Sequence, residues 1–530
     1  MTLGDLIRTP STVVSFNSIG GTLGSTGPNS GQIWLGTLHS GSLPVNLVDR
    51  SLISSWAVAG VSASGAEFAG YSVTLGVGTL SSAPNGAFGS YDQTIVTTGS
   101  VLSPNSSQNI KLLTSAFIAD GGTYVNSLNL SGAGSDLSFN NTNAGTLLVV
   151  SGGILKSGGS SSIGTSGVRG TLSSGVPRPN DSSELLLTVA PSSALTVYSK
   201  MDDNSASATT NLVISGGGTV TLAAGGSNTY SGVTVINGAN VNTAGAVASV
   251  YVIPGALILN GGALTLNAGS QLNSAAPIYI NASGSLSFSG IYSSTFNRTI
   301  TFNNSGGNTN PTLITGGSLI FGGTVAFDST NDSFSTVPTI SSSSANGGTL
   351  YLGEVNNTIS TSGLSPLGLV INTPVINGAL TKTGIGMLSL NSQLSTFSGG
   401  LTISRGGVIA GTSSLVSGGS FVSGPFGLGP VWMADNSANL IGVATAIYTT
   451  RLANYSAPTL PAYYDGTVAP LDMGPILESV HKTSRLLIAH EAVVPFGIGA
   501  EIARRLKETP EVVHCIESHH GEVEIGRAHV

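Results

Sequence analysis

Short runs in which apolar and polar residues alternate recur along most of this 530-residue chain. The clearest example is residues 216–241, GGGTVTLAAGGSNTYSGVTVINGANV, where the runs Thr219–Leu222 and Val233–Ile236 flank a Gly/Ser/Asn turn. Side chains along a strand point alternately to its two faces, so the apolar residues of each run are expected on a buried face. The pattern predicts two short strands joined by a turn that carries one aromatic residue, Tyr230.

The same arrangement returns in residues 383–408, TGIGMLSLNSQLSTFSGGLTISRGGV. Here Met387–Leu390 takes the place of the first run, Leu401–Ile403 that of the second, and Phe397 that of Tyr230. A short unit that repeats in this way indicates a solenoid, in which each coil covers the open edge of its neighbour.

Other parts of the chain show less regular versions of this pattern. Turn residues separate short apolar runs at intervals of roughly 8 to 12 residues, which is typical of an all-β protein. Examples of these runs are Ser72–Leu75, Leu147–Val150 and Leu185–Val189. In residues 256–272, ALILNGGALTLNAGSQL, the pattern predicts that Ile258 and Leu264–Leu266 point inward and that Asn260 and Asn267 lie at corners.

Three all-β architectures can produce such a pattern. A sandwich needs long crossing connections, and a propeller needs a period of about 40 to 50 residues with aromatic marks. A parallel β-helix needs only short strands, Gly/Asn corners and like residues stacked on like, and Asn, Ser and Thr form hydrogen-bonded ladders between coils. The even pattern favours an all-β solenoid of this last kind, divided into residues 1–210 and a part with clearer repeats, 211–465.

Composition agrees with this fold and excludes several classes of protein. The chain has 74 glycines and only 8% charged residues, a mixture that favours tight turns and short strands over helices. With 40% hydrophobic residues it can bury a core, so disorder is not expected. The net charge is −7 and the glycine-rich part has no basic patch, so nucleic acid is not an expected partner. The single cysteine, Cys515, excludes a disulfide framework.

The two copies resemble the autotransporter-associated β-strand repeat, also called the passenger-associated transport repeat. GGTVTL and SNTYSG match its pattern closely and LSTFSG more loosely. The matching positions are Gly217, Gly218, Thr219, Leu222, Asn228, Tyr230, Gly232, Phe397 and Gly399. The resemblance implies a right-handed parallel β-helix in a large exported bacterial protein, secreted or on the outer-membrane surface. It also implies an outer-membrane translocator and a signal peptide, and we expect both to lie outside this sequence.

The character of the chain changes near Ala469. Six of the seven histidines and the only cysteine follow this point, whereas only five of the 74 glycines do. Residues 470–506 alternate between helical and strand patterns, and they resemble the transketolase-like C-terminal domain of the β subunit of 2-oxo-acid dehydrogenase E1 components. The motifs that carry this likeness are His490–Ala492 and Phe496–Ala503. The thiamine diphosphate domain of those enzymes is not in this sequence.

A second change is expected near Arg505. Residues 507–524 resemble a piece of the HD-type phosphohydrolase domain of membrane-anchored bacterial endoribonucleases, without the His-Asp pair of that class. Residues 524–530, EIGRAHV, match the translation of a common sequencing adapter. We therefore expect residues 470–530 to be joined fragments of unrelated origin, and no intact α/β domain is expected there because its leading strands are missing.

Candidate sites in the tail have simpler explanations. His490 and Glu491 could be compared with an acid/base pair, but they are neighbours on a predicted strand, and side chains that point to opposite faces are the favoured interpretation. Gly497 and Gly499 begin a dinucleotide-like motif, but Ile502 occupies the third glycine position. A further group offers ligand types for zinc, but its spacing fits no common zinc finger. These residues are His514, Cys515, His519 and His520.

In the glycine-rich part the candidates are few. Gly132, Gly134 and Asp136 resemble one calcium-binding β-roll repeat, but such repeats bind calcium only as a stack. Tyr230 and Phe397 could serve as carbohydrate platforms, although capping the turn against the next coil is the favoured role. Asp202 and Asp203 form the one acidic pair that could be compared with a glycosidase site. We expect no catalytic residue, cofactor or metal ion.

The sequence favours a structural or adhesive passenger-like protein of the cell surface, a rigid and weakly charged rod. Its expected partners are other cell surfaces or polysaccharide. Two alternatives remain open. The chain could have the function of its tail, as the β subunit of a branched-chain or pyruvate dehydrogenase E1 component, or it could be a β-helix enzyme that acts on polysaccharide.

Overall fold

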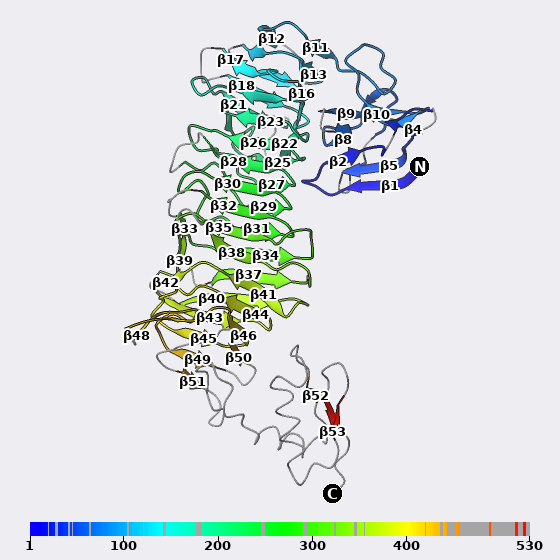
Figure 1. Ribbon diagram of the computed structural model, residues 1–530. Coiled ribbons are helices and arrows are strands. Elements are labelled where there is room, and N and C mark those ends of the chain that lie inside the picture. Colours follow the sequence, from blue (N-terminus) through cyan, green and yellow to red (C-terminus); the bar gives the residue numbers. More distant parts are fainter. Residues whose placement is uncertain are drawn as a thin grey trace. The chain divides into compact units, whose positions relative to one another are not determined.

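The computed structural model describes residues 1–442 except 20, 27–29, 41–42, 45, 63–64, 103–104, 120, 141–144, 176–181, 245–249, 290–293, 323–324, 344–346, 354–355, 419 and 435–437. Beyond residue 442 it describes the backbone of 452–454, 487–488, 515–517 and 523–525. The chain divides into two compact units (Figure 1). The first holds residues 1–443 with 448–462, and the second holds 444–447 with 463–530.

Two long parallel sheets dominate the first unit (Figure 1). Sheet 1 has sixteen strands: β11 (Gln93–Ile95), β13 (Asn109–Leu112), β16 (Ser127–Ser131), β19 (Gly153–Ser157), β22 (Ser182–Val189), β25 (Thr209–Ser215), β27 (Thr234–Asn237), β29 (Leu257–Asn260), β31 (Ile278–Asn281), β34 (Ile300–Asn304), β37 (Val325–Asn331), β40 (Asn356–Ser362), β43 (Ala379–Thr383), β45 (Leu401–Ile403), β49 (Val431–Met433) and β51 (Leu452–Asn454).

Sheet 2 has fifteen strands: β12 (Ser100–Leu102), β14 (Ala116–Ile118), β17 (Leu137–Phe139), β20 (Ser160–Ile163), β23 (Ala194–Val197), β26 (Thr219–Leu222), β28 (Asn240–Asn242), β30 (Ala263–Leu266), β32 (Ser285–Phe288), β35 (Thr312–Thr315), β38 (Thr339–Ser342), β41 (Leu367–Ile371), β44 (Met387–Leu390), β46 (Gly406–Ala410) and β50 (Ala438–Gly442). The chain visits the two sheets in turn, and each strand pairs with the strand one coil earlier and one coil later. This is a β-solenoid, and it confirms the predicted all-β stacked fold.

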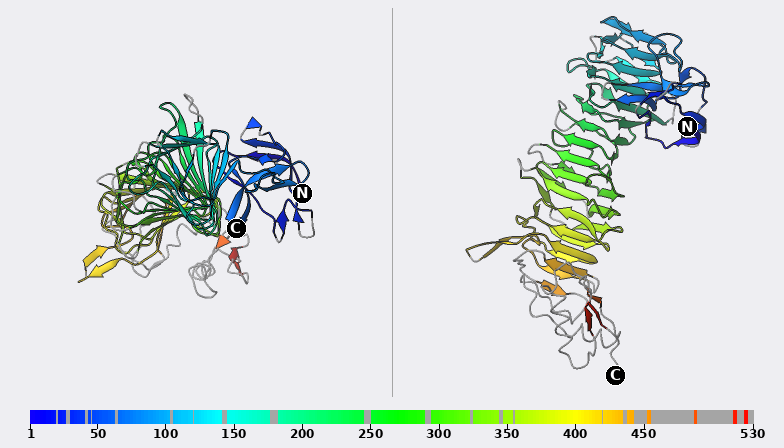
Figure 2. Two further views of the ribbon diagram at one scale, coloured as in Figure 1. Left: turned by 90° about the horizontal axis from the view of Figure 1, so that it is seen from above. Right: turned by 45° about the vertical axis from the view of Figure 1, so that its right-hand side comes forward.

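A third side of the coils carries shorter strands in two groups. The first group is β15 (Thr123–Val125), β18 (Thr146–Val149), β21 (Thr171–Ser174) and β24 (Lys200–Met201). The second is β33 (Ser294–Phe296), β36 (Ser318–Phe321), β39 (Thr349–Tyr351) and β42 (Val375–Ile376). A hairpin, β47 (Leu415–Ser417) and β48 (Ser420–Ser423), projects from the side of the coils (Figure 2).

The solenoid core consists of the inward residues of each strand. In β26, Val220 and Leu222 have no exposed surface, as the alternation predicts. The prediction for Ile258 was wrong, because Leu257 and Leu259 of β29 are the buried residues and Ile258 faces outward, half-buried. Three consecutive apolar residues contain two alternations, and only the register with neighbouring strands decides between them.

Residues 1–91, which we call the N-terminal lobe, lie outside both long sheets. The solenoid therefore begins at β11, and residues 1–210 are not one continuous solenoid. The strands of the lobe are β1 (Thr2–Arg8), β2 (Val14–Phe16), β3 (Thr22–Leu23), β4 (Ser30–Gly31), β5 (Trp34–Ser40), β6 (Leu43–Pro44), β7 (Ser51–Leu52), β8 (Ala57–Ser62), β9 (Gly65–Ser72) and β10 (Gly76–Thr79). Of the run Ser72–Leu75, predicted as a strand, only Ser72 belongs to β9, and Val73–Leu75 form the turn between β9 and β10.

The N-terminal lobe packs against the outer face of sheet 1 (Figures 1 and 2). Leu186 of β22 and Val213 of β25 point away from the solenoid core, and both are buried in one cluster with Trp56 of the lobe. Leu155 of β19 is buried against Phe68 of the lobe in the same way. These strands are apolar on both faces because both faces are covered.

In the second unit the described strands form one antiparallel sheet in the order β52 (Leu487–Ile488), β54 (Val523–Ile525) and β53 (Cys515–Glu517). Across the described residues, no helix has the length and apolar character needed to cross a membrane.

Candidate functional site

Each predicted repeat crosses from one coil to the next. In the first copy β26 belongs to sheet 2, and β27 belongs to sheet 1 of the following coil, so the two strands do not pair with each other. In the second copy β44 and β45 have the same relation. The turn between the strands carries Tyr230 or Phe397.

Both aromatic residues of the repeats are buried. Tyr230 is 1% exposed and Phe397 has no exposed surface. The Tyr230 hydroxyl shares a hydrogen bond of 2.6 Å with the Thr234 hydroxyl. Burial raises the pKa of Tyr230 well above its usual value, although the bond to Thr234 opposes this effect. A ring with almost no exposed surface cannot stack on a sugar, so neither residue is a carbohydrate platform.

Asn228 connects three coils from inside the turn. Its side-chain oxygen accepts a 2.9 Å hydrogen bond from the amide of Met201, and its Nδ2 donates to the carbonyl of Val252 at 2.7 Å. In the second copy Ser395 takes this position, and its hydroxyl accepts a 3.1 Å bond from the amide of Val375. The side chain replaces strand pairing where the backbone turns, which explains why a small polar residue occupies this position in both copies.

The glycines that end the two turns are also equivalent. The amide of Gly232 donates to the Thr210 carbonyl at 3.2 Å, and that of Gly399 donates to the Gly378 carbonyl at 2.8 Å. A Cβ at Gly232 would lie 2.4 Å from the same carbonyl oxygen, and a Cβ at Gly399 would lie 2.7 Å from its own. Neither site admits a side chain without a shift of the backbone.

The other positions of the repeat signature serve the corner before β26. Gly217 and Gly218 form the turn that leads from β25 into β26, and Thr219 begins that strand on its outer face. Leu222 ends the strand in the core. All nine signature residues therefore have places in coil geometry.

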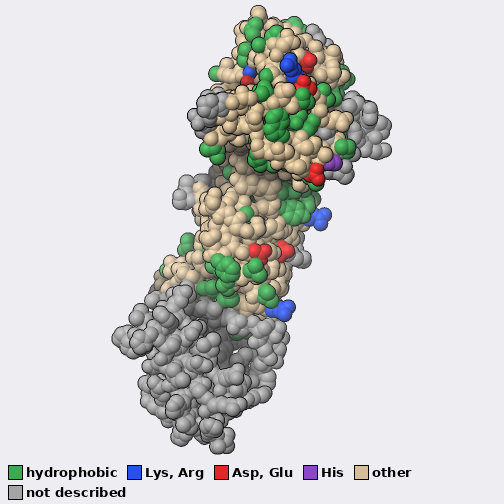
Figure 3. Space-filling model, turned by 90° about the vertical axis from the view of Figure 1, so that its right-hand side faces the viewer, with side chains coloured by type: hydrophobic (Ala, Val, Ile, Leu, Met, Phe, Trp, Pro, Cys, Tyr) green, Lys and Arg blue, Asp and Glu red, His purple; other side chains and the backbone are tan. Residues whose placement is uncertain are grey.

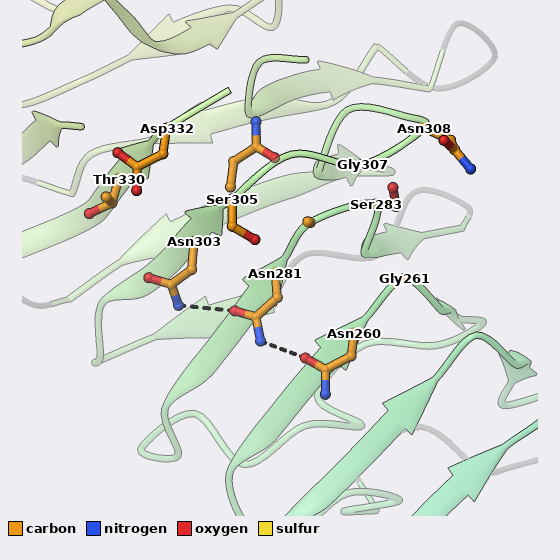
Figure 4. A pocket seen from close by; sticks show the side chains of 12 residues that line it. Asn260, Gly261, Asn281, Ser283, Asn303, Ser305, Gly307, Asn308, Thr330 and Asp332 are labelled. Atoms are coloured by element: carbon orange, nitrogen blue, oxygen red, sulfur yellow. Dashed lines mark hydrogen bonds between the residues drawn. The ribbon is translucent and has the colours of Figure 1, made fainter. Parts of the chain in front are cut away.

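A groove follows a row of asparagines at the ends of the strands of sheet 1 (Figure 4). We call Asn237, Asn260, Asn281 and Asn303 the asparagine ladder. The Nδ2 atoms of Asn260, Asn281 and Asn303 each donate to the Oδ1 of the asparagine one coil earlier, at 2.9, 2.6 and 3.0 Å in chain order. The Nδ2 of Asn237, the first residue of the ladder, donates to the Ser11 carbonyl of the N-terminal lobe instead. The groove has a volume of about 750 Å³, and Asp332 lies at its far end. Sequence analysis placed Asn260 at a corner and predicted ladders in general, but it missed this groove.

Two ion pairs connect the N-terminal lobe to the solenoid. Arg8 donates to Glu184 of β22 at 2.7 Å, and its guanidinium lies over the Trp56 ring at 5.4 Å. Lys111 of β13 pairs with Glu67 of the lobe. Because these pairs join segments far apart in the sequence, periodicity could not predict them.

Glu67 is also the centre of a hydrogen-bond network. Tyr91 and Asn129 both donate to its carboxylate, at 2.7 and 2.9 Å, and Asn129 donates to the Tyr91 hydroxyl at 2.8 Å. Burial and the Glu67 charge raise the pKa of Tyr91 well above its usual value, so this side chain stays a donor. The network joins the lobe to β16 of the solenoid.

Two lysines lie inside the solenoid at corresponding corners between sheets 1 and 2. Lys156 of β19 donates to the carbonyls of Leu130, Gly132 and Gly158 at 3.1, 2.6 and 2.7 Å. Lys382 of β43 likewise donates to three carbonyls, two of them in the corner that follows it. Burial lowers the pKa of Lys156 to about 8, against a weaker opposing effect of Asp136, and it lowers the pKa of Lys382 to about 8.

These lysines predict a rise of stability in mild alkali. Above pH 8 the folded protein loses a proton from Lys156 and from Lys382, while the unfolded chain keeps both until about pH 10.4. The unfolded state then binds more protons, so stability increases with pH in this window. We expect the urea midpoint to rise between pH 8 and 9.5, and the rise to be much smaller in the double variant Lys156→Met/Lys382→Met.

Lys200→Met is the matched control, because Lys200 is half-exposed and paired with Asp202. The upper limit of pH 9.5 avoids the titration of tyrosines in the unfolded chain, which begins near pH 10 and has the opposite sign. An equal slope in wild type and the double variant would contradict the role of these lysines.

The acidic candidates have structural partners. Partial burial raises the pKa of Asp202, but hydrogen bonds from Lys200 and Thr229 outweigh this effect and leave the pKa below its usual value. Asp203 accepts from the amides of Thr210 and Ser231. The two carboxylates therefore join coils and do not form an acid/base pair.

Asp136, considered for calcium, accepts two bonds from Ser162 of the next coil. Gly132 and Gly134 lie in the turn between β16 and β17. Within the part of the chain that the structure describes, no three His, Cys, Asp or Glu residues are close enough to hold a metal ion.

The candidates in the tail lie outside the described residues, except that the backbone of Cys515 begins β53. Those candidates are His490, Glu491, Gly497, Gly499, Ile502, His514, His519 and His520. Their expected roles stay predictions.

The tail is similar to known enzymes. Residues 466–523 match the family model of the transketolase C-terminal domain. A segment of 52 residues is 40% identical to the mitochondrial 2-oxoisovalerate dehydrogenase subunit beta of Chaetomium thermophilum, and it covers 10% of this chain and 11% of that subunit. No solved structure matches the chain.

This similarity supports the predicted likeness of residues 470–506 to a transketolase C-terminal domain. The match begins close to the predicted boundary at Ala469 and to the start of the second compact unit's main segment at Tyr463. It continues through residues 507–523, so the family model spans the expected second change near Arg505 as one domain. The likeness of residues 507–524 to an endoribonuclease, and that of 524–530 to an adapter, stay predictions.

Proposed function

We propose that residues 93–442 are the stalk of an exported bacterial surface protein of the autotransporter-passenger type, with a structural and adhesive role. One observation carries this proposal. The two repeat copies occupy equivalent places in the stack, each crossing from sheet 2 to sheet 1 of the next coil around a buried aromatic ring. The repeat is thus a unit of coil construction, as expected for a passenger-type repeat.

The surface of the solenoid fits contact with other surfaces better than it fits catalysis. On the face shown in Figure 3, charged side chains are few, and most of the described surface consists of backbone, uncharged polar or glycine residues and hydrophobic side chains. The acidic residues considered for chemistry, Asp202 and Asp203, are engaged between coils. We propose other cell surfaces and polysaccharide as the partners of this surface.

Folding of the stack would also assist export. Each new coil can pair with the exposed strand edges of the coil before it, and pairing in register buries its apolar residues. A chain that leaves a membrane one coil at a time is thereby drawn outward and cannot slide back. This role requires no ligand, cofactor or charged site.

Adhesion by the purified full chain tests the proposal. Beads coated with the chain are expected to attach to bacterial or epithelial cell layers several-fold more than beads coated with albumin or with the heat-denatured chain. Attachment no greater than that of albumin-coated beads would contradict the adhesive role.

The alternative function comes from the tail. The match of residues 466–523 to a transketolase C-terminal domain favours a relation to the β subunit of a 2-oxo-acid dehydrogenase. The aligned segment covers 11% of the related subunit, so its activity is only a second proposal for this chain. Decarboxylation of 2-oxoisovalerate by the full chain, dependent on added thiamine diphosphate, would support this alternative against the adhesive one.

A further inference from the structure

The groove along the asparagine ladder has two unlike walls (Figure 4). One wall is the ladder itself, with Asn260, Asn281 and Asn303 at the ends of β29, β31 and β34. The other wall is formed by the corners that follow these strands, including Ser283 and Asn308. Gly261 and Gly307 also line the groove, and because they have no side chains they do not fill it.

The ladder leaves hydrogen-bonding capacity toward the groove. An amide has two N–H donors and two acceptor positions on its oxygen. Within the described residues, the Nδ2 of Asn281 uses one donor toward Asn260, and its Oδ1 accepts one bond from Asn303. Asn260 and Asn281 therefore each keep one donor and one acceptor. The bonds along the ladder fix the orientation of every amide, so little entropy is lost when a ligand binds.

The spacing of the ladder selects the shape of a ligand. Strands of a sheet lie about 4.8 Å apart, and the ladder repeats this distance once per coil. Sugar rings in an extended β-linked chain repeat at nearly the same interval. A chain laid along the stack could thus present one ring to each asparagine.

Two exposed aromatic residues are close in the chain to residues that line this groove. Tyr279 precedes Asn281 by two residues on β31, so both side chains point to the outer face of sheet 1, and Tyr279 is 36% exposed. Phe334 is 78% exposed and follows Asp332, which lies at the end of the groove, by two residues. Aromatic faces beside polar groups suit the apolar face and the hydroxyl edge of a sugar ring.

The charge of the residues that line the groove indicates which class of polysaccharide it could bind. The residues that line the groove include one acidic residue, Asp332, and no lysine or arginine. A carboxylate without a compensating cation disfavours an anionic polysaccharide.

We propose that this groove binds one extended, neutral, β-linked polysaccharide chain along the stack of coils. Asn260, Asn281 and Asn303 hydrogen-bond its hydroxyls, and Tyr279 stacks against a ring. The proposal rests on the adhesive function above and adds its ligand class and site.

Calorimetric titration of the full chain tests this site. The probes are the hexasaccharide of β-1,4-linked glucose and the anionic hexamer of galacturonic acid. The neutral hexasaccharide is expected to bind at least ten-fold more tightly than the galacturonate. Asn281→Ala and, separately, Tyr279→Ala are each expected to weaken binding of the neutral probe about ten-fold.

Asn391→Ala is the matched control. Asn391 donates to Asn372 at 2.9 Å in another exposed asparagine pair, at the ends of the sheet 2 strands β41 and β44. Its removal should leave binding unchanged. Tyr279 is a partly exposed surface residue, so its variant tests the groove even if Asn281→Ala disturbs the ladder.

Three results would overturn the site: no binding of the neutral probe, unchanged binding in both groove variants, or variants that alter only self-association of the chain. The last result would assign the groove to a second copy of this protein. The bead experiment tests the adhesive function independently of this groove. Suppose that beads coated with the Asn281→Ala variant still attach to cells, while the neutral hexasaccharide does not bind in the titration. The adhesive function would then be supported, and the groove would be excluded as its site.

Discussion

Replacing Tyr230 with alanine is expected to destabilise the coils around it by about 3–5 kcal/mol, the usual cost of truncating a buried aromatic side chain. The ring is 1% exposed and fills the turn between β26 and β27, where it supports a corner that has few strand hydrogen bonds. Its loss leaves a cavity that the surrounding structure can fill only in part. Hydrogen exchange of the amides in β25, β27 and β29 measures the effect.

Tyr230→Phe is the control for this change. It removes only the hydroxyl that bonds to Thr234, and the expected cost is about 1 kcal/mol. Phe397 already occupies the equivalent position in the second repeat, so a phenyl ring fits this corner. Equal protection in the alanine variant and wild type would show that the aromatic ring does not support the coil. A solenoid can unfold in parts, so local exchange is a better readout than one midpoint.

Replacing Arg8 with alanine is expected to release the N-terminal lobe from sheet 1. The Arg8 side chain is 3% exposed, donates to Glu184, Ser40 and the Thr12 carbonyl, and lies over Trp56. Removing one partner of a buried ion pair costs about 3–5 kcal/mol, and the partial exposure of Glu184 places the value at the lower end. Faster hydrogen exchange in β1, β5 and β8 and increased binding of a hydrophobic dye measure the release.

Arg405→Ala is the matched control, since Arg405 is exposed at a corner after β45 and belongs to no ion pair among the described residues. It should change neither readout. The dye reports on Leu155, Leu186 and Val213, which the lobe covers. If the lobe of the Arg8 variant stays as protected as that of wild type, the apolar contact alone holds it.

Much of the repeat chemistry could be predicted from local sequence. Asn260 and Asn267 were expected at corners; Asn260 is the last residue of β29, and Asn267 follows β30. The two aromatic residues were expected to cap turns against the next coil, and both are buried there. Periodicity detects these features because the residues that decide them are close together in the chain.

The groove was harder to predict from the sequence. The groove depends on three asparagines that lie about one coil apart in the sequence, on different strands, and on Tyr279, which looks like any apolar residue of a strand. An equal spacing of asparagines that end apolar runs is the signal that could have found the ladder. No comparable sequence pattern indicated that Lys156 and Lys382 face inward, because an isolated lysine in a strand is normally a surface residue.

The sequence by itself determined the all-β solenoid, the corners, the two repeats and the change of character near Ala469, because alternation, turn residues and composition act locally. Only the tertiary structure decided which apolar residues face inward where several are adjacent, as in Leu257–Leu259. It also decided that residues 1–91 form a separate lobe, and that the asparagines of successive coils meet in one groove. Each of these depends on register with a neighbouring coil or on contact with a distant segment, and neither is contained in the pattern of a single strand.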